Sequence, residues 1–124
     1  MPSPSQRWGA DREADAERAL RRAGYRIVER NWRGAGAEID RIAWHREVLC
    51  IVEIRAREND ACGTPAETIG RSKQRHLIRG AMAYLAQRFA PGTEPVVRFD
   101  VVSIVDRRRG PTDIEIIEDA FVVE

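Results

Sequence analysis

Two apolar runs separated by a short polar break occupy the middle of the chain. The first run covers residues 39–43, the polar break covers residues 45–47, and the second run covers residues 48–52. β-Branched runs of this length around a polar turn predict a β-hairpin, which we place at residues 36–57.

The segments before and after the hairpin predict two helices and three further strands. An alanine- and arginine-rich segment from about Gly9 to Ala23 has helical spacing, and Gly24 follows it as a helix cap. A second helix is predicted from about Arg71 to Phe89, after a capping-box pattern at residues 64–67. The other predicted strands cover residues 25–32, 96–105 and 113–117.

The order of these elements is helix, three strands, helix, two strands. This order predicts a mixed α/β fold in which a central mixed sheet is flanked by helices, with charged strand ends gathered at one edge. Six apolar residues of the second helix predict the face that it buries. They are Leu77, Ile78, Ala81, Met82, Leu85 and Phe89.

Length and composition favour one globular domain. The chain has 124 residues and is 43% hydrophobic, so we predict a flexible tail at residues 1–8 and a single domain at residues 9–124. Neither a signal peptide nor a membrane-length apolar run is evident, which predicts a cytoplasmic protein that does not enter the membrane. The two cysteines have no spacing typical of a disulfide framework or a zinc site.

The formal net charge of +1 predicts that any basic surface is local rather than global. One candidate is the row formed by Arg71, Arg75 and Arg79, which recur every four residues in the second predicted helix. Such a row is either a solvated helix face or a set of phosphate contacts. Lys73 is the single lysine among 21 basic residues.

Acidic residues at the predicted hairpin are the strongest candidates for chemistry. Asp40 and Glu53 lie on neighbouring strands, and Arg55 follows two residues after Glu53 on the same face. Charged groups in a buried strand are costly unless they are paired or bind a metal. Two carboxylates suit Mg²⁺ or Mn²⁺, and a nearby cation suits phosphoryl oxygens. The alternative from spacing alone is a set of surface ion pairs.

Several spaced motifs together resemble a known family. They are Gly24-Tyr25, Arg30-Asn31, Glu38-Ile39-Asp40, the segment from Val52 to Arg57, Lys73-Gln74 and the segment from Arg98 to Val102. Together with a first helix carrying Glu13, they resemble the YraN family of small bacterial proteins. That family in turn resembles the restriction-endonuclease-like superfamily of PD-(D/E)XK nucleases.

The resemblance implies a restriction-endonuclease-like core and assigns a role to each acid. Asp40 and Glu53 are the implied metal-binding pair, Glu13 is the implied accessory acid on the first helix, and Glu38 opens the Glu-Ile-Asp motif. The superfamily has lysine where this chain has Arg55, and Arg41 stands where an apolar residue is usual.

The presence of Arg55 leaves open which residue supplies the catalytic cation. A guanidinium binds phosphate but has a pKa above about 12, so Arg55 does not accept a proton. Lys73 is therefore a second candidate for the site cation, with a chance surface lysine as the alternative.

Two functions follow from these observations. The first is a Mg²⁺- or Mn²⁺-dependent endonuclease that hydrolyses DNA phosphodiesters. In this function Arg71, Arg75 and Arg79 contact the phosphate backbone of the DNA and guide it to the site. The second is a catalytically impaired nucleic-acid-binding or interaction module with the same fold. The sequence does not choose between duplex, single-stranded and branched DNA, or RNA, and a homodimer is compatible with it.

Overall fold

The protein consists of one five-stranded mixed sheet with a helix on each face. The computed structural model describes residues 1–58, 69–107 and 111–123. The elements, in chain order, are α1 (Pro4–Arg22), β1 (Tyr25–Gly34), β2 (Ala37–His45), β3 (Val48–Arg57), α2 (Arg71–Arg88), β4 (Val96–Val105) and β5 (Asp113–Phe121). This order and the mixed α/β fold confirm the arrangement predicted from the sequence.

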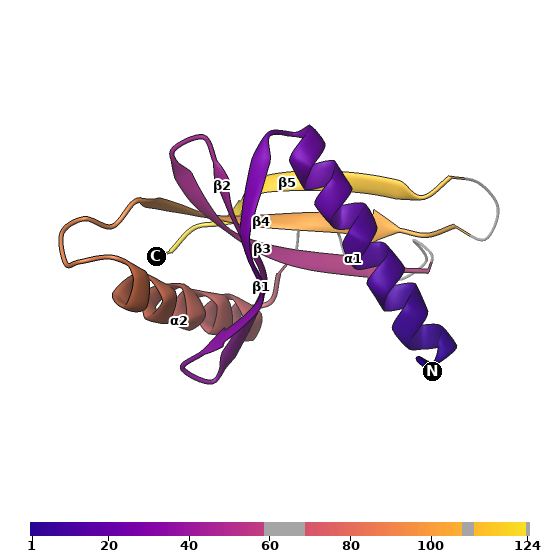
Figure 1. Ribbon diagram of the computed structural model, residues 1–124, viewed down its shortest axis with the longest axis horizontal. Coiled ribbons are helices and arrows are strands. Elements are labelled where there is room, and N and C mark those ends of the chain that lie inside the picture. The colour runs from indigo at the N-terminus through magenta and orange to yellow at the C-terminus, as the bar shows by residue number, and fades with distance from the viewer. Residues whose placement is uncertain (59–68, 108–110, 124) are drawn as a thin grey trace.

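The strands lie in the sheet in the same order as in the chain. β1, β2 and β3 are antiparallel neighbours, β4 is parallel to β3, and β5 is antiparallel to β4. A parallel pair needs a crossover connection, and the segment containing α2 provides it. β1 and β2 cross the direction of β3, β4 and β5 at a steep angle, as Figure 1 shows.

The two faces of the sheet bury separate hydrophobic clusters, because side chains alternate between faces along each strand. Leu20 of α1 packs with Cys50, Val52 and Val102 on one face. The other face carries the cluster under α2, whose fully buried members are Ile39, Ile42, Leu49, Ile51, Leu77 and Val101. The sheet is therefore covered on both sides, and the helices take opposite faces.

The N-terminal helix begins earlier than the sequence predicted. A flexible tail was expected at residues 1–8, but α1 begins at Pro4. Ser3 caps it, since its hydroxyl accepts a hydrogen bond from the Gln6 N–H and its own N–H donates to Gln6 Oε1 at 2.8 Å. This capping box, with proline in the first turn, starts the helix five residues before Gly9.

The second helix matches its predicted range closely, but its buried face differs. Leu77 and Ala81 are buried as expected, whereas Met82 is 66% exposed and Tyr84 takes a place in the core. The predicted stripe was too wide, because α2 contacts the sheet along one narrow face. The capping-box pattern predicted at residues 64–67 lies outside the described residues.

A buried charged cluster joins β4 to the start of β1 and the end of β5. The Asp100 side chain is fully buried, and its carboxylate accepts hydrogen bonds from Tyr25 Oη at 2.7 Å, Arg98 Nε at 2.8 Å and the Asp119 N–H at 3.0 Å. Burial opposes the charged form of Asp100, but these donors outweigh it and lower its pKa. The Arg98-Phe99-Asp100 motif therefore has a structural role in this chain.

Asp100→Ala tests this role. We expect the substitution to lower the free energy of unfolding by about 3–5 kcal/mol, because it leaves the Arg98 guanidinium without its carboxylate. Urea denaturation followed by circular dichroism measures the loss. Asp113→Ala is the matched control, since Asp113 forms an exposed ion pair with Arg107. This substitution should lower the free energy of unfolding by less than about 1 kcal/mol. Equal losses in the two variants would contradict the assigned role.

Candidate metal centre

Asp40 and Glu53 lie where β2 separates from β3. Ladder pairing between these strands ends at Arg41 and Val52, so the next residue on each strand has no ladder partner across the gap. Asp40 Oδ2 instead accepts a hydrogen bond from the backbone N–H of Ile54 at 2.9 Å. We call this point the fork. It holds two acidic side chains at the end of a buried part of the sheet.

The two carboxyl groups at the fork are close enough to perturb one another. Glu53 is only 8% exposed. Burial, together with the hydrogen bond and the charge of Asp40, raises the pKa of Glu53 to about 8, although Lys73 acts in the opposite direction. Two carboxylates crowded in this way are stabilised by a shared proton or by a cation. A divalent cation with oxygen ligands therefore fits the donor set at the fork.

Two cationic side chains lie beside the acid pair. Lys73 Nζ in the first turn of α2 is 2.9 Å from Glu53 Oε2. Glu53, Arg55 and Lys73 line one small pocket of about 160 Å³, together with Ile69 and Gly70 at the start of α2. The N-cap residue of α2 is Gly70, which has no side chain to accept a capping hydrogen bond, so the first backbone N–H groups of the helix add to the positive character of the pocket.

Glu13 is joined to the fork through Arg41. The Arg41 side chain is 5% exposed, and its Nη1 contacts Glu13 Oε1 at 3.2 Å and the backbone oxygen of Asp40 at 2.7 Å. Its Nε donates to Glu17 Oε2 at 2.8 Å. Hydrogen bonds from Arg30 and Arg41 lower the pKa of Glu17 to about 2 against the effect of burial. Arg41 and Glu17 thus anchor β2 to α1.

Arg41 stands out in the sequence as a departure from the family pattern, but the sequence predicts no role for it. The sequence also does not predict that Glu17 takes part in this network. Glu17 reads as an ordinary helix-surface charge, and only the packing of α1 against β2 shows that it is buried. The signal available in the sequence was the unusual arginine inside an apolar strand, which requires a buried partner.

Glu38 lies apart from the fork. It is exposed, and its carboxylate is 3.7 Å from Arg33 Nη2 near the β1–β2 turn. Across residues 1–58, 69–107 and 111–123, no group of three or more histidine, cysteine, aspartate or glutamate side chains is placed to hold a metal ion. The structure therefore brings Asp40, Glu53, Arg55 and Lys73 together, but it does not assemble the four-acid set implied by the resemblance.

Comparison with known proteins identifies the family. Residues 12–104 match the model of "Uncharacterised protein family UPF0102". The chain belongs to this family. The resemblance to the YraN family is thereby confirmed, since UPF0102 and YraN denote the same family. The likeness of this family to PD-(D/E)XK nucleases remains a prediction.

Curated relatives in the UPF0102 family match along nearly their whole length. A UPF0102 protein of Syntrophotalea carbinolica is 40% identical over 119 residues, which cover 95% of this chain and 91% of the relative. A UPF0102 protein of Chlorobaculum tepidum is 41% identical over 120 residues, which cover 93% of this chain and 92% of the relative. One of Hahella chejuensis is 42% identical over 113 residues, covering 91% and 88%. In the part of the chain that the structure describes, neither helix is long and apolar enough to cross a membrane.

The raised pKa of Glu53 predicts how stability changes with pH in the absence of metal. Between the ordinary pKa of 4.5 and about 8, Glu53 ionises in the unfolded chain while it stays protonated in the folded protein. The contribution of Glu53 to stability is therefore present at low pH and is lost as the pH rises through about 8. We expect Glu53→Gln to stabilise the protein by at least about 1 kcal/mol near pH 8.5 and much less near pH 4.5.

Thermal unfolding in EDTA at the two pH values measures this difference. Glu38→Gln is the matched control, because Glu38 is exposed and should change stability little at either pH. A gain from Glu53→Gln that is the same at both pH values would contradict the assigned environment of Glu53.

Proposed function

We propose that this UPF0102 protein is a divalent-metal-dependent nuclease that hydrolyses phosphodiester bonds in DNA. The observation that supports the proposal most directly is the Asp40–Glu53 acid pair, with the Lys73 ammonium 2.9 Å from Glu53. Neighbouring acids would hold a divalent metal, and the neighbouring cations suit a substrate that carries negative charge.

The residues at and beside the fork have two proposed roles, which are metal binding and stabilisation of negative charge. Asp40 and Glu53 would hold Mg²⁺ or Mn²⁺, and the Ile54 N–H fixes the orientation of the Asp40 carboxylate. When bound, the metal polarises a phosphoryl oxygen and lowers the pKa of a coordinated water. Lys73 and Arg55 stabilise the negative charge that develops on the phosphate oxygens.

Arg55 restricts where the proton of the attacking water goes. A guanidinium donates two parallel hydrogen bonds to a phosphate but does not accept a proton at neutral pH. In the proposed reaction, Arg55 therefore positions the phosphate, and the proton of the attacking water passes to bulk water or to a phosphate oxygen of the substrate. Lys73 supplies the ammonium that the superfamily has at the position of Arg55.

A second candidate function rests on the same residue. If the reaction requires lysine at position 55, Arg55 leaves a catalytically impaired module that binds nucleic acid without cutting it. Arg55 is the observation that favours this alternative, and the acid pair favours the nuclease.

A cleavage panel separates the two functions. Linear, flapped and four-way DNA are incubated with Mg²⁺ or Mn²⁺, and calorimetry measures metal binding in parallel. We expect cleavage by the native protein, and we expect both metal binding and cleavage to be lost in Asp40→Ala and Glu53→Ala. Asp113→Ala is the matched control for removing a carboxylate. No metal binding at millimolar concentration, even with DNA present, would exclude the nuclease.

Substitutions at Lys73 test the identity of the site cation. We expect Lys73→Ala to lower the cleavage rate by about 10²- to 10³-fold, because a charge-stabilising donor is lost. Lys73→Arg should keep most of the activity, and Arg55→Lys should maintain or raise it. Arg46→Ala, on the exposed β2–β3 turn, is the matched control. Unchanged cleavage and DNA affinity in both Lys73 variants would show that Lys73 has no role.

A further inference from the structure

Positive charge is concentrated on α2. The chain as a whole has a formal charge of +1, but α2 carries five basic residues and no acidic residue. Arg71, Arg75 and Arg79 are exposed, and none of them forms an ion pair with an acidic residue in the part of the chain that the structure describes. By contrast, arginines of α1, β1 and β4 form ion pairs. This segregation of charge indicates a polyanionic partner.

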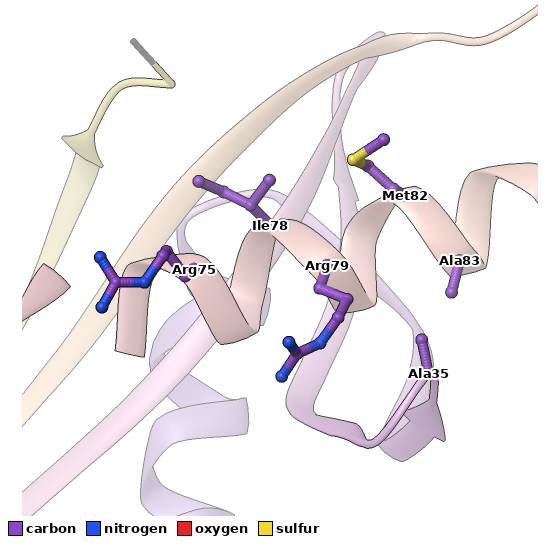
Figure 2. A pocket seen from close by; sticks show the side chains of 6 residues that line it. All are labelled: Ala35, Arg75, Ile78, Arg79, Met82 and Ala83. Atoms are coloured by element: carbon purple, nitrogen blue, oxygen red, sulfur yellow. The ribbon is translucent and has the colours of Figure 1, made fainter. Parts of the chain in front are cut away.

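The outer face of α2 also exposes apolar side chains. Arg75, Ile78, Arg79, Met82, Ala83 and Ala35 line a hollow of about 460 Å³. Figure 2 shows Ile78 and Met82 extending above the helix in this view, Arg79 below it and Arg75 towards the start of the helix, around the same hollow. Basic and apolar groups therefore lie next to one another along the helix.

A second hollow continues this surface towards the C-terminus. It has a volume of about 480 Å³, shares Arg75 and Ile78 with the first, and adds Phe121, Val122 and Val123 at the end of β5. Met82, Val122 and Val123 are 66%, 60% and 59% exposed. Among the residues that the structure describes, no acidic side chain lines either hollow. We name the joined surface the α2 trough, defined by Arg71, Arg75, Ile78, Arg79, Met82 and Val122.

The α2 trough adjoins the fork at the start of the helix. Gly70 and Lys73 line the acid pocket, whereas Arg71, Gln74 and Arg75 line the trough. From Arg71 to Met82 the helix rises about 16 Å. A strand whose phosphate lies at Lys73 is therefore able to continue directly into the trough.

We propose that the α2 trough binds an unpaired DNA strand next to the bond that is cut, so that the preferred substrate carries a single-stranded segment. The arginines contact the phosphates, and the faces of unstacked bases cover Ile78, Met82 and Val122. In duplex DNA the base faces are stacked inside the helix, and only an unpaired strand offers phosphates and apolar base faces together. The inference rests on the proposed nuclease function, which makes DNA the polyanion.

Fluorescence anisotropy in EDTA tests the trough without requiring cleavage. The probes are a labelled strand of about 15 nucleotides and the corresponding duplex. We expect Arg75→Ala/Arg79→Ala to weaken strand binding at least about tenfold and to reduce the slope of log affinity against log salt by about 1.4, at about 0.7 for each lost contact. Arg7→Ala/Arg22→Ala, two exposed arginines of α1 on the opposite side of the sheet, should leave both quantities unchanged.

Met82→Ala/Val122→Ala tests the apolar part of the trough. Both side chains are exposed, so the fold should tolerate their loss. We expect strand affinity to fall about threefold or more while duplex affinity stays constant. Equal affinity for strand and duplex, with neither changed by this variant, would overturn the inference. So would equal competition by a polyglutamate peptide, or self-association through this face.

The two proposals fail in different ways. If the trough binds single-stranded DNA but the protein shows no metal-dependent cleavage, the proposed nuclease function is contradicted and the inference about the trough is supported. If cleavage is equally fast on duplex and on flapped DNA and does not change in the trough variants, the nuclease function is supported and the inference about the trough is contradicted.

Discussion

The close contact between the carboxyl groups of Asp40 and Glu53 is the interaction on which the candidate metal centre depends. A buried Glu53 and a half-buried Asp40 are mutually unfavourable when both are charged, and here the cost appears as a raised Glu53 pKa. The fold maintains the contact because β2 leaves β3 at this point and the Ile54 N–H holds Asp40 in place. A divalent cation would turn this repulsion into attraction, and this is the role that we propose for the contact.

The rest of the structure supports the fork from both sides of the sheet. On the α1 face, Arg41 links the Asp40 backbone to Glu13 and Glu17, so the strand that carries Asp40 is fixed to the helix. On the α2 face, the start of the helix brings Lys73 to Glu53. Further along the sheet, the Asp100 cluster ties β4 to β1 and β5. Positive charge thus surrounds an acidic centre.

The order of elements and the position of the acid pair were predictable, because both depend on local patterns in the sequence. Hydrophobic alternation located the strands, and a departure from it located Asp40 and Glu53. The contacts of Glu13, Glu38 and Arg41 were not predictable, since they depend on how α1 and the β1–β2 turn pack against the sheet. Met82 was misplaced for a related reason, because helical spacing does not show how wide a face the sheet covers.

The most direct test of the metal centre is nuclear magnetic resonance of the labelled protein with substoichiometric Mn²⁺. The paramagnetic ion broadens signals of nearby amides, so it reports the position of the metal without requiring activity. We expect the amide signals of Asp40, Glu53 and Ile54 to broaden first and Asp40→Ala to abolish the effect. Broadening centred on Glu38 or on another exposed carboxylate, or no selective broadening, would contradict this expectation.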